Sequence, residues 1–387
     1  MARCRVKAYD MGVHRVSLGL VQAIRNAGWK FDDSQANPPT NEFISFTSLL
    51  FHPQAKLVYC GLTSWKNNIF CSFDPRTKRF QDLGYAKIGT RFDVKIHRSL
   101  ELAEDGKIVA AVAGLHQYGV HPDAPGGAVF TYDPRSGQYD VLGIPSPHDY
   151  IQSIAFDRKR GIIYGNGYPL GTEWGFDMAT RKPFPMKWVS GHKLRCDNEG
   201  FLWGQSGERM RWPGINDEAE RIASAVFSVQ TSSPKLYKFT PETGYQVFDS
   251  YLYPVGGSNP GIANLIDGGD GFMYVGGSNG ALYRVDKETG ACDFLGMASP
   301  GGRLEGLGLG PDGLLYLAGG SFYCTRVAAF DRKTGRLTDL GPIYDPERDE
   351  TCIIVHALCV DDQGTLYVGE TDNCERSGFL WECRPEL

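Results

Sequence analysis

Apolar and polar residues alternate along this chain in short runs, which are separated by turns rich in glycine, proline and aspartate. In GFMYVGGSNGALYRVDKETGACDFLG (271–296), a first run with an aromatic residue near its middle leads into a Gly-rich break. A second run ends in Asp, and after the turn KETG a short third run ends in Gly. Alternation over such short lengths, bounded by turn residues, predicts β-strands.

The same phrase occurs seven times along the chain. Its copies cover 57–84, 107–143, 161–184, 200–248, 271–296, 313–341 and 364–385. A further run precedes them, as YIQSIAFDRKR does at 150–160 and RLEGLGLGPDG does at 303–313. Each copy therefore supplies four strands over about forty to sixty residues, which is the size of one blade of a β-propeller.

The predicted fold is thus all-β: a seven-bladed β-propeller with four antiparallel strands per blade, forming a single domain over 1–387. The seventh copy stops soon after its third strand. We expect the N-terminal segment, CRVKAYD or residues just after it, to supply the missing strand and close the ring. Within 1–45, the stretch VSLGLVQAIRNAGW (16–29) has helical spacing and is expected to form a cap or part of a lid.

Composition agrees with this fold and narrows the partners. The chain has 387 residues with 48 Gly and 12% aromatics, and a formal net charge of -5 with both signs interspersed. Without a basic tract or a long apolar run, we expect a monomer with no nucleic-acid and no membrane partner. The start, MARCRVKAYDMGV, lacks the apolar core of a signal peptide, which predicts a cytoplasmic protein, or a secreted one if a leader was removed.

The ten cysteines are scattered, with no CxxC pair, so most are expected to be buried thiols. Bridges between Cys60 and Cys71, or between Cys374 and Cys383, stay open at this point. The breaks GGSNG and LAGGS lead into further strands, whereas nucleotide-binding loops lead into helices. No cofactor is therefore expected.

A structural zinc or calcium ion is the one exception that the sequence leaves open. His192 and Cys196 are four residues apart, as are Cys352 and His356. In a strand this spacing points both side chains the same way, but neither pair has a visible second pair to complete a zinc site. The expectation is therefore that no metal takes part in the site.

Two histidines at the ends of one predicted hairpin are the leading candidates for chemistry. The first strand of a blade lines the central channel and the second strand returns beside it, so the start of the first and the end of the second share a face. His97 lies at the start of such a hairpin and His116 at its end, with an Asp-Gly turn between them. The two imidazoles are expected side by side at the channel mouth.

The same reasoning places further candidates on this face. They are Tyr150 and Tyr168 from the third blade, His192, Arg195 and Arg209 from the fourth, Arg303 from the sixth and His356 from the seventh. A single His or Tyr near a loop is more often structural than catalytic, and His356 also fits a buried core histidine. The coincidence of His, Tyr and Arg on adjacent blades is what favours a site.

This set of side chains suits proton removal next to a sugar carboxylate. Arg and Lys bind carboxylates, and His and Tyr are proton-transfer groups. With the carboxylate of a uronate neutralised, the proton at C5 becomes acidic enough to be abstracted by a Tyr or His. A His or Tyr then protonates the departing O4, and an unsaturated uronide results by β-elimination without a cofactor.

The seven repeats and the pair KIHRSL…DGKI…GLHQ resemble the propeller polysaccharide lyases that act at glucuronate, the ulvan lyases and the rhamnose–glucuronate lyases. The resemblance implies a lyase acting on a uronate-containing oligo- or polysaccharide, with His97 and His116 as the catalytic pair. It implies Tyr150 or Tyr168 as the catalytic tyrosine and Arg195 or Arg209 as the carboxylate neutraliser. His192, Arg303 and His356 are then expected to bind substrate.

Two alternatives remain open, because a fold does not fix a reaction. The first is a glycoside hydrolase, similar to the rhamnosidase on the same scaffold, which would release a reducing sugar without an unsaturated product. The second is a non-catalytic propeller that binds a glycan or a protein. A flat apolar face would favour this binding role, whereas a deep cleft with convergent His and Arg would favour an enzyme.

Overall fold

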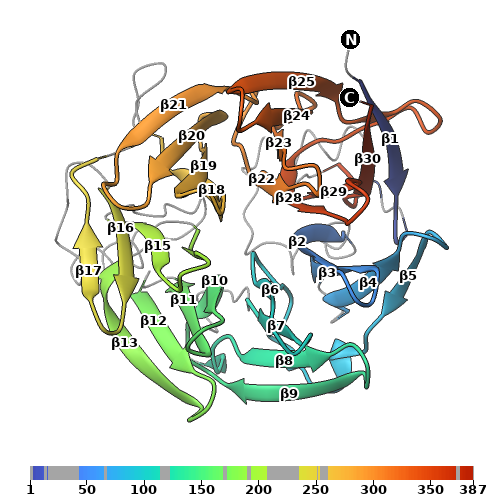
Figure 1. Ribbon diagram of the computed structural model, residues 1–387. Helices are drawn as coiled ribbons and strands as arrows, with labels where there is room; N and C mark the ends of the chain where they lie inside the picture. Colours follow the sequence, from blue (N-terminus) through green and yellow to red (C-terminus); the bar gives the residue numbers. More distant parts are fainter. Residues whose placement is uncertain are drawn as a thin grey trace, which may run out of the picture.

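Seven antiparallel sheets of four strands each stand in a ring about a common axis (Figure 1). The computed structural model describes residues 3–12, 15, 43–64, 68–113, 123–168, 172–189, 193–206, 235–250, 252, 260–371 and 375–386. The predicted seven-bladed β-propeller is confirmed, as is the number of strands per blade.

The first four blades follow the chain from its inner to its outer strand. Blade one contains β2 (Ser45–His52), β3 (Leu57–Thr63), β4 (Phe70–Asp74) and β5 (Arg79–Asp82). Blade two contains β6 (Leu100–Leu102), β7 (Ile108–Ala111), β8 (Val129–Asp133) and β9 (Gln138–Gly143). Blade three contains β10 (Tyr150–Asp157), β11 (Ile162–Tyr168), β12 (Thr172–Asp177) and β13 (Lys182–Val189). Blade four contains β14 (Arg195–Cys196), β15 (Leu202–Ser206), β16 (Lys235–Thr240) and β17 (Gly244–Val247).

The remaining blades complete the ring. Blade five contains β18 (Ile262–Asp267), β19 (Phe272–Gly277), β20 (Ala281–Asp286) and β21 (Cys292–Met297). Blade six contains β22 (Gly306–Leu309), β23 (Leu315–Gly319), β24 (Arg326–Asp331) and β25 (Arg336–Pro342). Blade seven contains β28 (Val355–Val360), β29 (Leu366–Glu370), β30 (Leu380–Glu386) and β1 (Arg3–Tyr9). A small hairpin of β26 (Tyr344–Asp345) and β27 (Glu350–Thr351) joins blades six and seven, and η3 (Tyr85–Lys87) is a short helical turn between blades one and two.

The ring is closed by strands from the two ends of the described chain. β1 pairs with β30 in antiparallel register, from Arg3 opposite Glu386 to Tyr9 opposite Leu380. Its inward residues Val6 and Ala8 join the core between blades six and seven. The predicted closing strand is therefore confirmed, while the cap helix expected at 16–29 lies outside the described residues.

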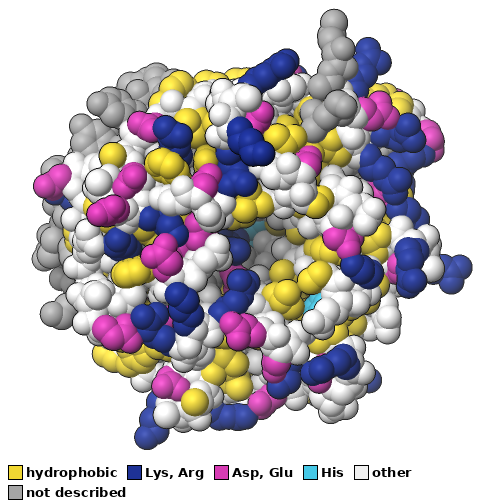
Figure 2. Space-filling view, in the orientation of Figure 1, with side chains coloured by type: hydrophobic (Ala, Val, Ile, Leu, Met, Phe, Trp, Pro, Cys, Tyr) yellow, Lys and Arg dark blue, Asp and Glu magenta, His cyan; other side chains and the backbone are white. Residues whose placement is uncertain are grey.

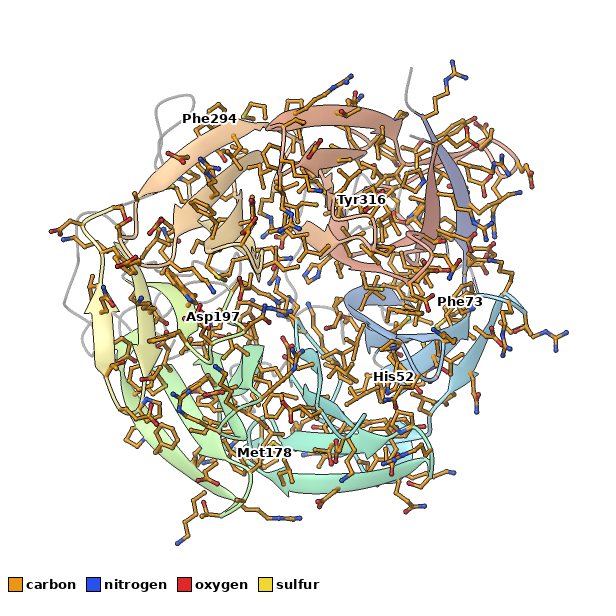
Figure 3. The ribbon with its side chains drawn as sticks, viewed as in Figure 1. His52, Phe73, Met178, Asp197, Phe294 and Tyr316 are labelled. Atoms are coloured by element: carbon orange, nitrogen blue, oxygen red, sulfur yellow. The ribbon has the colours of Figure 1, made fainter. Side chains whose placement is uncertain are left out.

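Seven hydrophobic clusters fill the spaces between neighbouring blades of the described structure. Between blades one and two, Tyr59 and Phe70 pack against Phe130 and Tyr132. The second and third strands are buried because a blade covers each of their faces, whereas outer strands such as β21 are half exposed. Figure 3 labels Phe294 of β21 at this outer edge. Blade-to-blade packing thus provides the core, and the axis is left to polar residues.

Four inner strands bulge at the same level near their first residues. The ladder register between the inner strand and its neighbour skips one residue at Thr47, Gln152, Ala263 and His356. A bulge leaves the extra residue unpaired in the ladder and re-aims its side chain and carbonyl group. The bulges therefore direct polar groups of blades one, three and seven toward the axis.

The cysteines of the described chain are free thiols. Cys60 and Cys71 lie directly opposite each other on β3 and β4, both buried, and burial raises the pKa of the Cys60 thiol well above its usual value. Cys383 is also free, and Cys374 lies outside the described residues. Within the described ranges, no helix has the length and apolar character required to cross a bilayer.

Candidate functional site

A cavity of about 310 Å³ lies along the axis of the ring, and residues of all seven blades line it. Its charged lining comprises four basic and two acidic side chains among the described residues: Arg98, Arg158, Lys193, Arg195, Glu101 and Glu305. Figure 2 shows a hollow at the centre of the disc, with basic and acidic side chains around it. The axial cavity is thus a polar, positively charged space that would attract an anion.

His97 is held by two of the bulges. It precedes β6 and is 2% exposed, and its Nδ1 lies 2.6 Å from the carbonyl oxygen of Gln152 in blade three. Its Nε2 lies 3.0 Å from the Nε2 of His356 in blade seven. Because a carbonyl oxygen only accepts, Nδ1 of His97 donates the proton, and a neutral ring keeps a lone pair at Nε2. The two rings therefore meet across the channel with their Nε2 atoms facing.

Arg98 connects the pair of His97 and His356 to blade six through its hydrogen bonds. Its Nη1 donates to Nε2 of His97 at 3.0 Å, and its Nη2 donates to both carboxylate oxygens of Glu305 at 3.0 and 3.1 Å. Arg303 adds a further ion pair to Glu305 at 3.1 Å. The Arg98 and Glu305 side chains are 4% and 1% exposed, whereas that of Arg303 is 41% exposed. Glu305 thus forms ion pairs with two arginines, one inside the channel and one at its edge.

Arg98 is a site residue that the sequence pattern did not identify. Successive side chains of a strand point to opposite faces, so His97 and Arg98 would not both be expected in the channel. Arg98 has a left-handed φ of 46°, and this bend breaks the alternation. Its N–H donates to the carbonyl of the bulged Thr47 at 3.3 Å, which holds the bend in place. Nothing in the local sequence KIHRSL indicates such a bend.

Lys193 and Arg195 form the basic side of the cavity in blade four. Leu194 between them is fully buried in the core between blades three and four, so strand alternation sends its two neighbours toward the axis. Arg195 Nη1 donates to Glu101 of β6 at 2.8 Å. Burial in the channel, Arg195 and Arg98 lower the pKa of Lys193 to about 7, although Glu101 and Glu305 act in the opposite direction. The sequence places Lys193 beside Arg195 on the candidate face, but its environment also depends on charges of blades two and six.

A second cavity, of about 410 Å³, continues from the first toward the other face of the disc. Glu101, Arg158 and Arg195 line both cavities. The second cavity has five acidic and three basic side chains in its lining, Asp197 and Asp267 among the acidic ones. Figure 3 labels Asp197, which lies nearer the axis than Phe294 does. The sign of the fixed charge therefore reverses along the channel.

The other predicted site residues are only partly described. Tyr150 begins β10, is 6% exposed, and lies opposite Tyr168 in the register of β10 and β11. The two tyrosine positions are thus neighbours at one end of blade three. His116, His192 and Arg209 lie outside the described residues, as does any contact between His97 and His116. The assignment of His97, His116, Tyr150 and Tyr168 as catalytic stays a prediction.

The residues weighed as zinc ligands are dispersed in the described structure. His356 contacts His97, while Cys352 is fully buried and lies in the core between blades six and seven. Across the described ranges, no group of three or more His, Cys, Asp or Glu residues is placed to hold a metal ion. His192 and its surroundings lie outside those ranges. The expectation of no cofactor, with a structural zinc or calcium ion left open, stays a prediction from the sequence.

Two exposed aromatic residues stand beside the channel mouth in blade six. Phe322 and Tyr323 are 70% and 49% exposed and have left-handed φ angles of 51° and 67°. The connection that carries them starts at Gly320, whose N–H donates to Arg303 and whose carbonyl accepts from Val355, the residue before His356. Two consecutive bulky residues in this backbone region are strained, and strain of this kind concentrates at ligand-binding sites.

Comparison with known proteins adds a fold relationship. No family model matches the chain, and no curated protein matches its sequence. Among solved structures, the extracellular domain of a hybrid two-component system from B. thetaiotaomicron is similar to it, with a TM-score of 0.58 and 12% sequence identity. The similarity covers 88% of this chain, whereas this chain spans 38% of the length of that one. At this identity the likeness shows the β-propeller fold alone.

Proposed function

We propose that the protein is a lyase that cleaves a uronate-containing oligo- or polysaccharide at glucuronate by β-elimination. The observation that carries this proposal is the placement of His356 and Arg98, both of which contact His97, in the lining of a cavity whose charged residues are mostly basic. The substrate would bind at the end of the channel where His97 lies. The reaction needs a carboxylate-binding site and proton-transfer groups, and this end of the channel offers both types of side chain.

A sugar carboxylate fits the arginines of the site. Guanidinium groups bind carboxylates through strong charge-assisted hydrogen bonds, which gain strength where water is excluded. Arg303, at the edge of the channel, already holds a carboxylate, that of Glu305. Arg195 lines the axial cavity from blade four. A uronate held by these groups would have the charge of its carboxylate neutralised, which acidifies the C5 proton.

The elimination then proceeds without an added reactant. A base removes the C5 proton, the C4–O4 bond breaks, and a double bond forms between C4 and C5. The departing O4 takes a proton from an acid of the site. Tyr150 and Tyr168 are the predicted donors, because both lie at one end of blade three. His97 has both ring nitrogens engaged, so its role in the proposal is to position Arg98 and His356.

The exposed aromatic residues at the mouth support a sugar ligand. Phe322 and Tyr323 present apolar ring faces to solvent in a strained connection, with no burial of Phe322 to offset the strain. An exposed apolar surface beside a polar cleft is typical of a ligand-binding groove. A pyranose ring has apolar C–H faces and polar edges, and it would suit aromatic rings beside arginines.

A second candidate function is non-catalytic binding of an anionic glycan at the same site. It is favoured by the burial of His97, whose nitrogens both have partners. The two candidates share the ligand and differ in whether a bond is broken. They can therefore be separated by one set of measurements on one panel of compounds.

The test is a panel of uronate oligosaccharides, followed by ultraviolet absorbance of the C4–C5 double bond and by mass spectrometry. The proposal expects an unsaturated product from wild type and its loss in Arg98→Met and His97→Ala. His52→Gln is the matched histidine control, since His52 bonds Gly106 at the end of β2 away from the site. Binding without product would select the binding function, and a new reducing end without a double bond would select a hydrolase.

A further inference from the structure

Lys193 is a basic residue of the axial cavity, and no acidic side chain of the described residues forms an ion pair with it. It lies two residues before Arg195, and both line the cavity. The two carboxylates that act on Lys193 already form ion pairs with arginines. Glu101 binds Arg195, and Glu305 binds Arg98 and Arg303. Among the described residues, no side-chain hydrogen bond or ion pair involves Lys193.

The surroundings of Lys193 favour its uncharged form. Arg195 of β14 and Arg98 before β6 face it as cations, and Glu101 and Glu305 face it as carboxylates. Arg158 and His356 line the same cavity from blades three and seven. Removal from water and the two arginines outweigh the two carboxylates, which lowers the pKa of Lys193 to about 7. The free amine is therefore accessible near neutral pH.

We propose that Lys193 is the general base that removes the C5 proton in the elimination, an inference that rests on the proposed function. A free amine accepts that proton and becomes an ammonium ion. The electron pair of the C5–H bond forms the C4–C5 double bond, and the C4–O4 bond breaks. O4 takes its proton from the tyrosine donor, and exchange with water restores both side chains. Arg195, one of the two arginines proposed to bind the carboxylate, also disfavours the charged form of the amine.

The site geometry favours Lys193 over His97 for this role. A base must have a lone pair that is not already used, within reach of the substrate. The lone pair at Nε2 of His97 faces Arg98 and His356. Lys193 lines the axial cavity together with Arg195, one of the arginines that would hold the carboxylate on C5. Lysines brought to a pKa near neutrality are suited to proton abstraction.

The first measurement is independent of any substrate. The full-length protein is pulse-labelled with acetic anhydride over a pH series, and acetylation of each lysine is quantified by mass spectrometry. The inference expects Lys193 to reach half of its maximal labelling rate near neutral pH. Lys333, an exposed lysine of the turn after β24, serves as the internal reference in the same digest. A Lys193 profile that follows Lys333 up to alkaline pH would overturn the inference.

The second measurement uses Lys193→Arg and Lys193→Met on a uronide that wild type cleaves. Lys193→Arg keeps the positive charge but cannot accept a proton at neutral pH, and Lys193→Met keeps the chain length without charge. The inference expects at least a hundredfold loss of kcat in both, with the calorimetric Kd for the uronide changed less than tenfold. The acidic limb of the wild-type rate profile, set by a group titrating near neutrality, should vanish from the residual activity.

The outcomes separate this inference from the proposed function. Product formation by wild type and by Lys193→Met at similar kcat would overturn the base role and leave the lyase in place. Loss of kcat in Lys193→Met with retained binding, together with neutral-pH labelling, would support it. If wild type forms no unsaturated product from any uronide, the proposed function fails, and the base role fails with it whatever the labelling shows.

Discussion

Arg98 occupies the centre of the molecule with its guanidinium between an imidazole and a carboxylate. A buried ion pair adds little net stability, because the cost of taking both charges out of water offsets their attraction. Removing one partner is different, since the other charge is then left buried without compensation. Glu305 is 1% exposed and would lose its inner arginine, keeping only Arg303 at the edge of the channel.

Arg98→Met should therefore lower the free energy of unfolding by about 3 kcal/mol, mainly through the stranded Glu305 carboxylate. Chemical denaturation monitored by tryptophan fluorescence measures the change. Arg303→Met is the control, because that side chain is 41% exposed and its pair should contribute about 1 kcal/mol or less. The double variant Arg98→Met, Glu305→Leu should recover most of the loss. Equal effects of Arg98→Met and Arg303→Met would contradict this account.

Lys193 makes stability depend on pH in a defined direction. Its pKa is about 7 in the folded chain and near 10.5 when unfolded, so the unfolded chain binds more protons between these values. The cost of burying the amine is present in full below pH 7 and disappears as pH rises to 10.5. Lys193→Met should thus be more stable than wild type at pH 6, with the difference shrinking toward pH 10. Lys333→Met is the control, and a pH-independent difference for Lys193→Met would refute the expectation.

At the scale of elements, the turns between the third and fourth strands of the blades share one backbone feature. Their last residue is left-handed, with φ of 70° at Gly137, 71° at Gly335 and 55° at Arg181. Glycine adopts this conformation without strain, whereas a residue with a Cβ pays about 1–2 kcal/mol. The sequence itself favours Gly here, as in PRSG and RKTG, and Arg181 departs from that preference.

Arg181→Gly should raise the free energy of unfolding by up to about 1 kcal/mol, since relief of strain exceeds the flexibility that glycine adds to the unfolded chain. The ion pair of Arg181 with Asp140 is exposed on both sides and contributes little. Gly137→Ala is the converse variant and should destabilise by about 1 kcal/mol, because open space surrounds a Cβ there and only φ resists it. Denaturation midpoints of the two variants should move in opposite directions, and parallel shifts would be inconsistent with strain.

The elements also explain what the sequence could predict. The strands and turns follow from the local alternation of apolar and polar residues, and the number of blades follows from a sequence repeat that occurs once in each blade. The fold was therefore predictable. The bulges at Gln152 and His356 were not, because a register shift depends on the neighbouring strands. Arg98 was missed because its place in the channel depends on a backbone bend. The environment of Lys193 depends on charges of other blades, and the contact of His97 with His356 joins positions 259 residues apart.

At the scale of the whole molecule, closure of the ring is what assembles the site in the channel. Pairing of β1 with β30 completes blade seven, which lies beside β2 of blade one and carries His356 to the axis. Only a closed ring brings His97 of blade two, Glu305 of blade six and His356 together. The site is therefore a property of the complete propeller rather than of any single blade.

The two adjoining cavities of the channel differ in charge, and this difference predicts which of them an anionic glycan binds. The axial cavity has four basic and two acidic side chains, while the second cavity has three basic and five acidic ones. A uronate would be attracted at the first and repelled at the second. Arg303→Gln should accordingly weaken the binding of a uronate oligosaccharide about tenfold, which corresponds to the loss of one hydrogen bond to a charged group.

Glu104→Gln is the matched change in the second cavity, where Glu104 is an exposed lining residue. Because an anion that enters beside His97 never approaches this position, its Kd in titration calorimetry should stay within about twofold of wild type. Added salt should weaken binding to wild type more than binding to Arg303→Gln, since screening acts on the attraction that the arginine supplies. A stronger effect of Glu104→Gln than of Arg303→Gln would place the glycan at the opposite end of the channel, away from the His97 and His356 pair.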